Sequence, residues 1–208
     1  MDRQTTRHAE WAGWAFWAVY GALLILALVA TIAFSPLRET YDWRFFLHIA
    51  AGSLFLGLAP FQFIGAVRRK FPKYHRMAGR GLVVAALLAI FSTFALHMTP
   101  LGTGILPSQT VLLLIWLGSV LAAVWCIRHG DVVWHQRHMA RAVVAGAYFL
   151  LIRIVDRLIG VDTILGFEEN PSIQFVNSDW LGWLVPMIAV EIFMVLTTGG
   201  RGRPRVSA

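Results

Sequence analysis

The sequence predicts an all-α fold, a polytopic bundle of six transmembrane helices, and three observations lead to it. The chain of 208 residues is 58% hydrophobic and only 14% charged, with a mean hydropathy of +0.65. Its apolar residues gather in six runs, and a bilayer core of about 30 Å takes roughly 20 helical residues. The polar segments between the runs alternate between basic and acidic. We expect one domain, 1–208, with helices at about 11–34, 45–67, 80–98, 111–127, 138–159 and 180–197.

The distribution of basic residues predicts the orientation. Fourteen of the 18 lysines and arginines fall in four segments, which are 1–10, 68–80, 128–141 and 199–208. The alternate segments hold only two arginines and six acidic residues, and they are 35–44, 98–110 and 160–179. Because basic loops are retained in the cytoplasm, we expect both termini there. The predicted location is the cytoplasmic (inner) membrane of a bacterium.

The net charge of +7 also bears on the partners of the chain. The basic residues are divided among four segments, whereas a nucleic-acid-binding protein gathers them on one face. Attraction between basic loops and anionic lipid headgroups explains them. We therefore expect the lipid bilayer and anionic headgroups as partners, and no nucleic acid.

The first helix, 11–34, resembles a signal peptide but is about 24 residues long, beyond the roughly 7–15 of a signal-peptide core. No small-x-small cleavage site follows it, so we interpret it as a retained signal anchor. The single cysteine, Cys126, excludes an internal disulfide and any paired-cysteine metal motif.

The second helix, 45–67, carries a histidine a few residues below the outer surface. A stripe at helical spacing contains His48, Gly52, Phe55, Ala59 and Gln62. The functional interpretation makes His48 a ligand to haem iron or another metal, or a proton carrier. The structural interpretation makes it a histidine hydrogen-bonded to a neighbouring helix. Pro60 should kink this helix.

Charged residues within the last two helices are the second unusual feature. Arg153, Asp156 and Arg157 lie in helix 138–159, and Glu191 lies in helix 180–197, near mid-membrane. Arg153 is the expected partner of Glu191, or else of Asp156 on its own helix. Two interpretations remain open: a polar cavity open to the outside, lined by His48, Arg153, Asp156 and Glu191, or a structural ion pair between the helices.

The cytoplasmic segments RRKFPKYHRMAGR and RHGDVVWHQRHMAR hold most of the histidines. His75, His129, His135 and His138 could meet there, and His135, His138 and Met139 share one helical face. Haem ligation is one interpretation, and anchoring to lipid headgroups is the other. A bis-histidine haem needs two histidines at one depth. However, His75 and His97 are 22 residues, or about 33 Å, apart along a continuous helix, which places both at headgroup level and disfavours enclosed haems.

From Leu47 to about Ile159 the chain resembles the bacterial membrane family called "domain of unknown function 2306". The family pattern begins with a histidine-containing helix and Pro–x–Gln–Phe, here His48 and 60–63. His–Arg–x–x–Gly–Arg follows at 75–80, then His–x–Arg–x–Met–x–Arg at 135–141, Arg153, and the acidic position Glu191. His138 departs from the pattern, which more often has an aromatic residue there, and His97 has no counterpart. The resemblance implies the fold and a set of residues, but no chemistry.

The candidate residues form three groups. The cofactor-binding candidates are His48, His75 and His135. The buried polar cluster comprises Gln62, Arg153, Asp156 and Glu191. The cytoplasmic basic motif comprises Arg69, Arg76, Arg80 and Arg141. The sequence indicates no catalytic group and no metal site, since it lacks nucleophile-elbow, Walker, dinucleotide and zincin motifs.

Three functions remain open, with no cofactor identified. The first is binding of a small ligand or cofactor within the bundle, with a haem b electron carrier as its most specific form. The second is a non-catalytic accessory subunit of a larger membrane complex, with other membrane proteins as partners; small residues suited to close helix packing are Gly13, Gly21, Ala51, Gly52, Gly57 and Gly146. The third is a proton-coupled transporter that uses Glu191, although no inverted repeat is visible.

Overall fold

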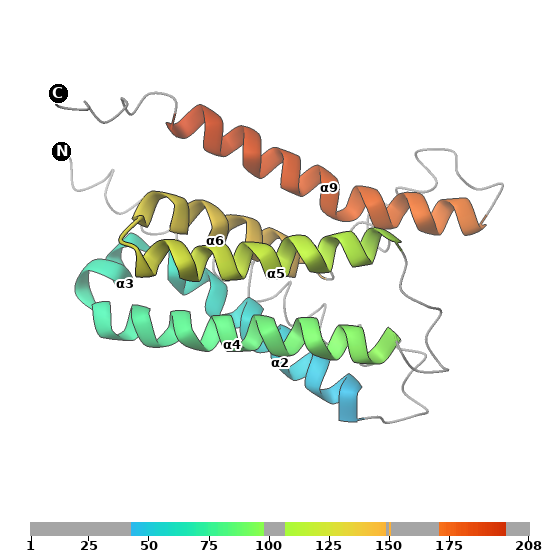
Figure 1. Cartoon of the computed structure of the whole chain (residues 1–208), viewed down its shortest axis with the longest axis horizontal. Helices are drawn as coiled ribbons and strands as arrows, with labels where there is room; N and C mark the ends of the chain where they lie inside the picture. The colour runs from blue at the N-terminus through green and yellow to red at the C-terminus, as the bar shows by residue number, and fades with distance from the viewer. Residues whose placement is uncertain (1–42, 98–106, 149, 151–170, 199–208) are drawn as a thin grey trace, which may run out of the picture.

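A computed structural model describes residues 43–97, 107–148, 150 and 171–198, and every element in these ranges is a helix (Figure 1). The helices are α2 (Trp43–Phe63), α3 (Gly65–Lys70), α4 (Pro72–His97), α5 (Pro107–Arg128), α6 (Val132–Gly146) and α9 (Pro171–Thr198). Four segments are long and apolar enough to cross a membrane, namely Trp43–Phe63, Pro72–Leu96, Pro107–Arg128 and Asp179–Leu196. The described chain is therefore all-helical with several candidate membrane spans, as predicted.

The predicted helices match the described ones in position but not at their ends. Four of them coincide with α2, α4, α5 and α9, and α6 covers the first part of 138–159. The helix 11–34 and residues 151–159 lie outside the described residues. Apolarity locates only the part of a helix that lies in hydrocarbon, so a helix that continues into the polar layer is predicted too short. Thus α4 begins at Pro72 rather than 80, and α9 begins at Pro171 rather than 180.

The segment between α2 and α4, interpreted above as a loop, is largely helical. Pro60 lies in the last turn of α2, which ends at Phe63 instead of 67, and Ile64 takes an extended conformation with φ −72° and ψ 106°. The short helix α3 follows. Phe71 ends α3, because the residue before a proline avoids the helical region. Pro72 then occupies the first turn of α4, where its missing N–H costs nothing.

The turn between α5 and α6 has standard helix-ending chemistry. Gly130 adopts φ +80°, the left-handed conformation that glycine tolerates best, and the N–H of Asp131 donates to the carbonyl of Cys126 at 2.9 Å. The Asp131 side chain then accepts from the N–H of Trp134 at 3.0 Å, which caps α6. This turn fixes the start of α6 at Val132, and with it the positions of the histidines and arginines along that helix.

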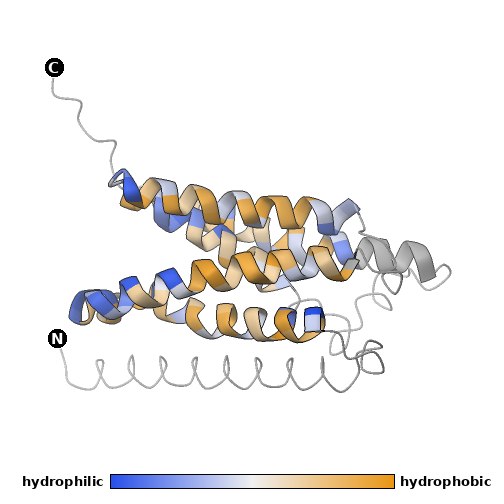
Figure 2. Cartoon of the chain, turned by 60° about the horizontal axis from the view of Figure 1, so that its bottom comes forward, coloured by the Kyte–Doolittle hydropathy of each residue, from blue (hydrophilic) through white to orange (hydrophobic). Residues whose placement is uncertain are grey.

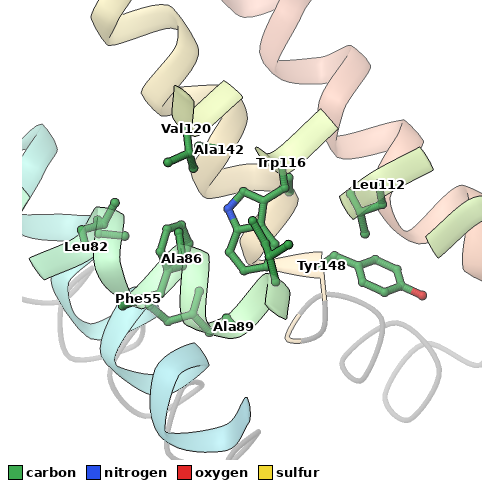
Figure 3. Close-up of a cluster of buried hydrophobic side chains, with 14 of the residues drawn as sticks. Phe55, Leu82, Ala86, Ala89, Leu112, Trp116, Val120, Ala142 and Tyr148 are labelled. Carbon is green, nitrogen blue, oxygen red and sulfur yellow. The ribbon is translucent and has the colours of Figure 1, made fainter. Parts of the chain in front are cut away.

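The helices form two antiparallel pairs and a cover. α2 packs against α4, α5 packs against α6, and α9 lies against α6 and α5 (Figure 1). α9 contains Pro186 and bends part-way along its length, as expected of an internal proline. The core where the pairs meet is apolar and centred on Phe55 and Trp116, whose rings pack edge to face with centroids 5.1 Å apart (Figure 3).

The two ends of this bundle differ in charge, and hydrophilic residues gather at one of them (Figure 2). We call the end formed by α3, the first turns of α4 and α6, and the last turns of α5 and α9 the basic end. It carries Arg68, Arg69, Lys70, Lys73, Arg76, Arg80, Arg128, Arg137 and Arg141. The end where α2 and α5 begin and α4 stops is the opposite end. The interior of the helices between the two ends is mainly apolar, which suits a multi-pass membrane protein.

Candidate functional site

An ion pair at the basic end joins α6 to α9. Both oxygens of Glu191 accept from Arg141: Oε1 from Nε, and Oε2 from Nη2 at 2.9 Å. Nδ1 of His138 lies 3.3 Å from Nη1 of the same arginine. The side chains of Arg141 and Glu191 are 22% and 40% exposed. The pair is thus half-buried, and its two-pronged geometry holds the carboxylate in one position.

This pair differs from the one expected from the sequence, which joined Glu191 to Arg153. Arg153 and Asp156 lie outside the described residues. Glu191 lies in the half of the span Asp179–Leu196 that leads toward the basic end, five residues, or about 7.5 Å, before Leu196. His48 lies near the start of α2, at the opposite end. His48 and Glu191 thus lie toward opposite ends of the described bundle, whereas the interpretation as one outer cavity placed them together.

His48 makes the contact that the structural interpretation predicts. Its Nδ1 lies 3.0 Å from Oγ1 of Thr93, and the Thr93 hydroxyl donates to the carbonyl of Ala89 at 2.7 Å. Because that hydroxyl has one proton, its oxygen accepts from the imidazole N–H. His48 therefore links α2 to α4 through a hydrogen bond.

Gln62 and His75, from two separate sequence motifs, come together at the basic end. A Cβ placed on Gly79 would lie 3.1 Å from Oε1 of Gln62, so the glycine leaves room for the amide. Nε2 of Gln62 and Nδ1 of His75 are both buried and have no hydrogen-bond partner. Arg68 and His135 interact electrostatically with His75, which places α4 and α6 histidines near each other. Motif residues of α2, α4 and α6 thus converge.

His135 is oriented in a way that suits ligand binding. Its Nδ1 lies 2.9 Å from the carbonyl oxygen of Ala123 on α5. A carbonyl can only accept, so Nδ1 donates to it, and the tautomer of the neutral ring that makes this bond has its lone pair on Nε2. A backbone carbonyl on one ring nitrogen is the usual support of a histidine whose other nitrogen binds a metal or ligand. Among the described residues, however, no group of three or more metal-binding side chains could hold an ion.

The cytoplasmic basic motif divides into two kinds of residue. Arg69, Arg76 and Arg80 are exposed, and the Arg69 guanidinium lies over Gly65. Arg141 is instead half-buried in the ion pair with Glu191. Three of the four arginines are thus exposed at the basic end, whereas the fourth ties two helices together.

Sequence reasoning missed a polar cluster at the opposite end. Asp179 was assigned to an outer loop, but it lies within α9 and is only 1% exposed. Tyr148 and Gln109 donate to it from two other parts of the chain. Only its position next to the apolar run signalled this role, because the polar residues before it hide the helical continuation.

Comparison with known proteins identifies a family but no characterised relative. No curated protein and no solved structure matches the chain. The family model described as "Predicted membrane protein (DUF2306)" matches residues 45–194, which include α4, α5, α6 and most of α2 and α9. The motifs noted in the sequence all fall within this range. The chain therefore belongs to the DUF2306 family of predicted membrane proteins.

Proposed function

We propose that this protein binds a small ligand or cofactor at the basic end, between α2, α4 and α6. The observation that carries the proposal is the pair of buried polar atoms without partners, Nε2 of Gln62 and Nδ1 of His75. Each unsatisfied polar atom costs about 1–3 kcal/mol, and such atoms in folded proteins usually meet water, an ion or a ligand. A bound molecule that contacts both would remove this cost.

The charges around these atoms indicate the class of ligand. Nε2 of Gln62 can only donate a hydrogen bond. Arg68 and His135 both interact electrostatically with His75. Glu191, the described carboxylate on this side of α9, has both oxygens occupied by Arg141. The ligand should therefore offer acceptors such as carboxylate, phosphate or carbonyl oxygens. Haem b has two carboxylates and binds histidine, so a haem-based electron carrier with His75 and His135 as candidates is the redox form of the proposal.

The ligand should survive purification in mild detergent and be detectable by native mass spectrometry. We expect wild type to carry additional mass that is absent from Gln62→Leu and His75→Ala. His129→Ala is the matched control, because His129 lies at the same end but stacks on Trp125 and bonds its carbonyl at 2.8 Å. Absorption spectra before and after dithionite test haem in the same samples. A colourless protein after haem-supplemented expression rejects the haem form, and a ligand-free wild type contradicts the proposal.

Two other functions keep some support. Gly52 and Gly57 on α2 have no described atom within 4 Å of an added Cβ, so they leave open surface that a neighbouring membrane protein could use, as in an accessory subunit. The native mass spectrum reports such a partner directly. The proton-coupled transporter relied on Glu191, which is held by Arg141, so the ion pair favours a structural role for that residue.

We further propose that the basic end faces the cytoplasm of a bacterium, in the inner membrane. In a Cys126→Ser background, which removes the one native thiol, Val133→Cys should resist a membrane-impermeant maleimide in intact spheroplasts and react after permeabilisation. Val133 is 57% exposed at the basic end. Thr103→Cys, in the uncharged segment 98–110, is the matched control and should react in intact spheroplasts. The reverse labelling pattern would invert the orientation.

A further inference from the structure

The opposite end of the bundle contains a buried carboxyl group with an incomplete set of hydrogen bonds. The Tyr148 hydroxyl and Nε2 of Gln109, the latter at 3.3 Å, both donate to Oδ1 of Asp179. Oδ2 of the same carboxyl is buried and has no partner, and Oε1 of Gln109 is also buried and has none. Gln109 and Asp179 therefore share one hydrogen bond, and each side chain keeps one buried oxygen without a partner.

Within the described ranges, no basic side chain forms an ion pair with Asp179. α5 and α6 are the helices that pack against α9. Their basic and histidine side chains all lie toward the basic end, and they are Arg128, His135, Arg137, His138 and Arg141. Tyr148 is the described titratable group that meets Asp179. A carboxylate that is 1% exposed and has no described cation beside it is costly in an apolar bundle.

A single proton would satisfy both leftover oxygens. A carboxylic acid and a primary amide can form a two-armed ring, with N–H to O=C on one arm and O–H to O=C on the other. The first arm is the Gln109 Nε2 contact with Oδ1. The second arm needs a hydroxyl on Oδ2 that donates to Oε1, and these are the two atoms without partners. Tyr148 marks Oδ1 as the carbonyl oxygen, because that atom already accepts two hydrogen bonds.

We propose that Asp179 is a proton-binding site, held neutral at the opposite end of the bundle by Gln109 and Tyr148. Tyr148 comes from the chain that continues α6, and its hydroxyl points away from the Phe55–Trp116 core (Figure 3). Two further polar atoms near this site are buried without hydrogen-bond partners. They are Oγ of Ser108, which precedes Gln109, and Nε1 of Trp183, one turn after Asp179. α9 thus carries a paired, ionised Glu191 and a neutral Asp179 about 18 Å apart along its axis. The site is independent of the ligand site at the basic end.

Infrared spectroscopy of the full-length protein in liposomes tests this assignment. At neutral pH, wild type should show the carbonyl band of a protonated carboxylic acid, shifted to lower frequency in D₂O. The band should be lost in Asp179→Asn. In Gln109→Leu it should remain but move to higher frequency, because the acid loses its hydrogen-bonded amide. Asp131→Asn is the control: Asp131 is an exposed cap that accepts from Trp134, so its removal should leave the band unchanged.

Two outcomes would overturn the proposal. The first is a wild-type spectrum with no protonated acid band, or a band that is identical in Asp179→Asn. The second concerns a different occupant, since the unpartnered oxygens could also hold a monovalent cation. A thermal midpoint of wild type that rises in sodium chloride relative to choline chloride, with no rise in Gln109→Leu, would assign the site to a cation. If Asp179→Asn does not fold, the Gln109→Leu band shift and the D₂O shift still decide the question.

Discussion

Gly146→Ala should destabilise the folded bundle by about 2–3 kcal/mol, although it adds one methyl group. The added Cβ would collide with Cε1 of Phe55, and it would lie only 2.7 Å from Cζ2 of Trp116 and 2.9 Å from Cδ1 of Phe55. These distances are too short for non-bonded carbon atoms. The two rings cannot move away easily, because they pack edge to face and are 0% and 3% exposed. The methyl group therefore forces α6 away from α2 and α5.

Unfolding in mixed detergent micelles, followed by circular dichroism, gives the free-energy change. Gly118→Ala in α5 is the matched control: it makes the same chemical change in a helix where nothing lies within 4 Å of the new Cβ. It should be neutral or stabilise by up to about 1 kcal/mol through helix propensity. Gly146→Ala combined with Phe55→Leu should regain part of the loss, because the smaller side chain opens space. If Gly146→Ala and Gly118→Ala behave alike, the close packing at Gly146 is contradicted.

Small residues show how far sequence alone could predict the packing. Gly146 and Ala51 were both proposed as close-packing positions, and both are buried in the bundle. Gly52 and Gly57 were proposed on the same grounds, but nothing described lies near them. A small side chain permits close approach without requiring it. Which face of α2 meets a neighbour depends on the path of other helices, and that is not encoded in the glycine itself.

The sequence motifs named several of the residues that meet at the basic end, but not which side chain pairs with Glu191. Gln62, His75 and His135 come from three motifs, and the structure brings them to the basic end. This follows from topology, because consecutive spans return alternate helix ends to one side. The partner of Glu191 did not follow. Depth estimates from apolar runs are uncertain by a turn or more when helices extend past the hydrocarbon, and one turn decides whether Glu191 meets Arg141 or another arginine.

The Arg141–Glu191 pair should contribute measurably to the attachment of α9. We expect Glu191→Gln and Arg141→Gln each to lower the free energy of unfolding by about 1–2 kcal/mol. The estimate is discounted because the two side chains are 22% and 40% exposed and water screens them. The double variant should cost less than the sum of the two single variants. Each single variant leaves one charge without its partner, whereas the double variant leaves none. A coupling energy of about 1 kcal/mol in the double-mutant cycle would be the signature of the pair.

A second cycle supplies the control. Arg80 lies on α4 at the same end and is exposed, so Arg80→Gln combined with Glu191→Gln should be additive within about 0.5 kcal/mol. Additive behaviour in both cycles would show that the Arg141–Glu191 contact has no energetic weight, and the role of Glu191 would have to be sought elsewhere. Coupling confined to Arg141 would instead show that this acidic residue serves to hold α6 and α9 together. Glu191 would then be a structural tie, and Asp179 would be the described carboxyl group of α9 that is not engaged in an ion pair.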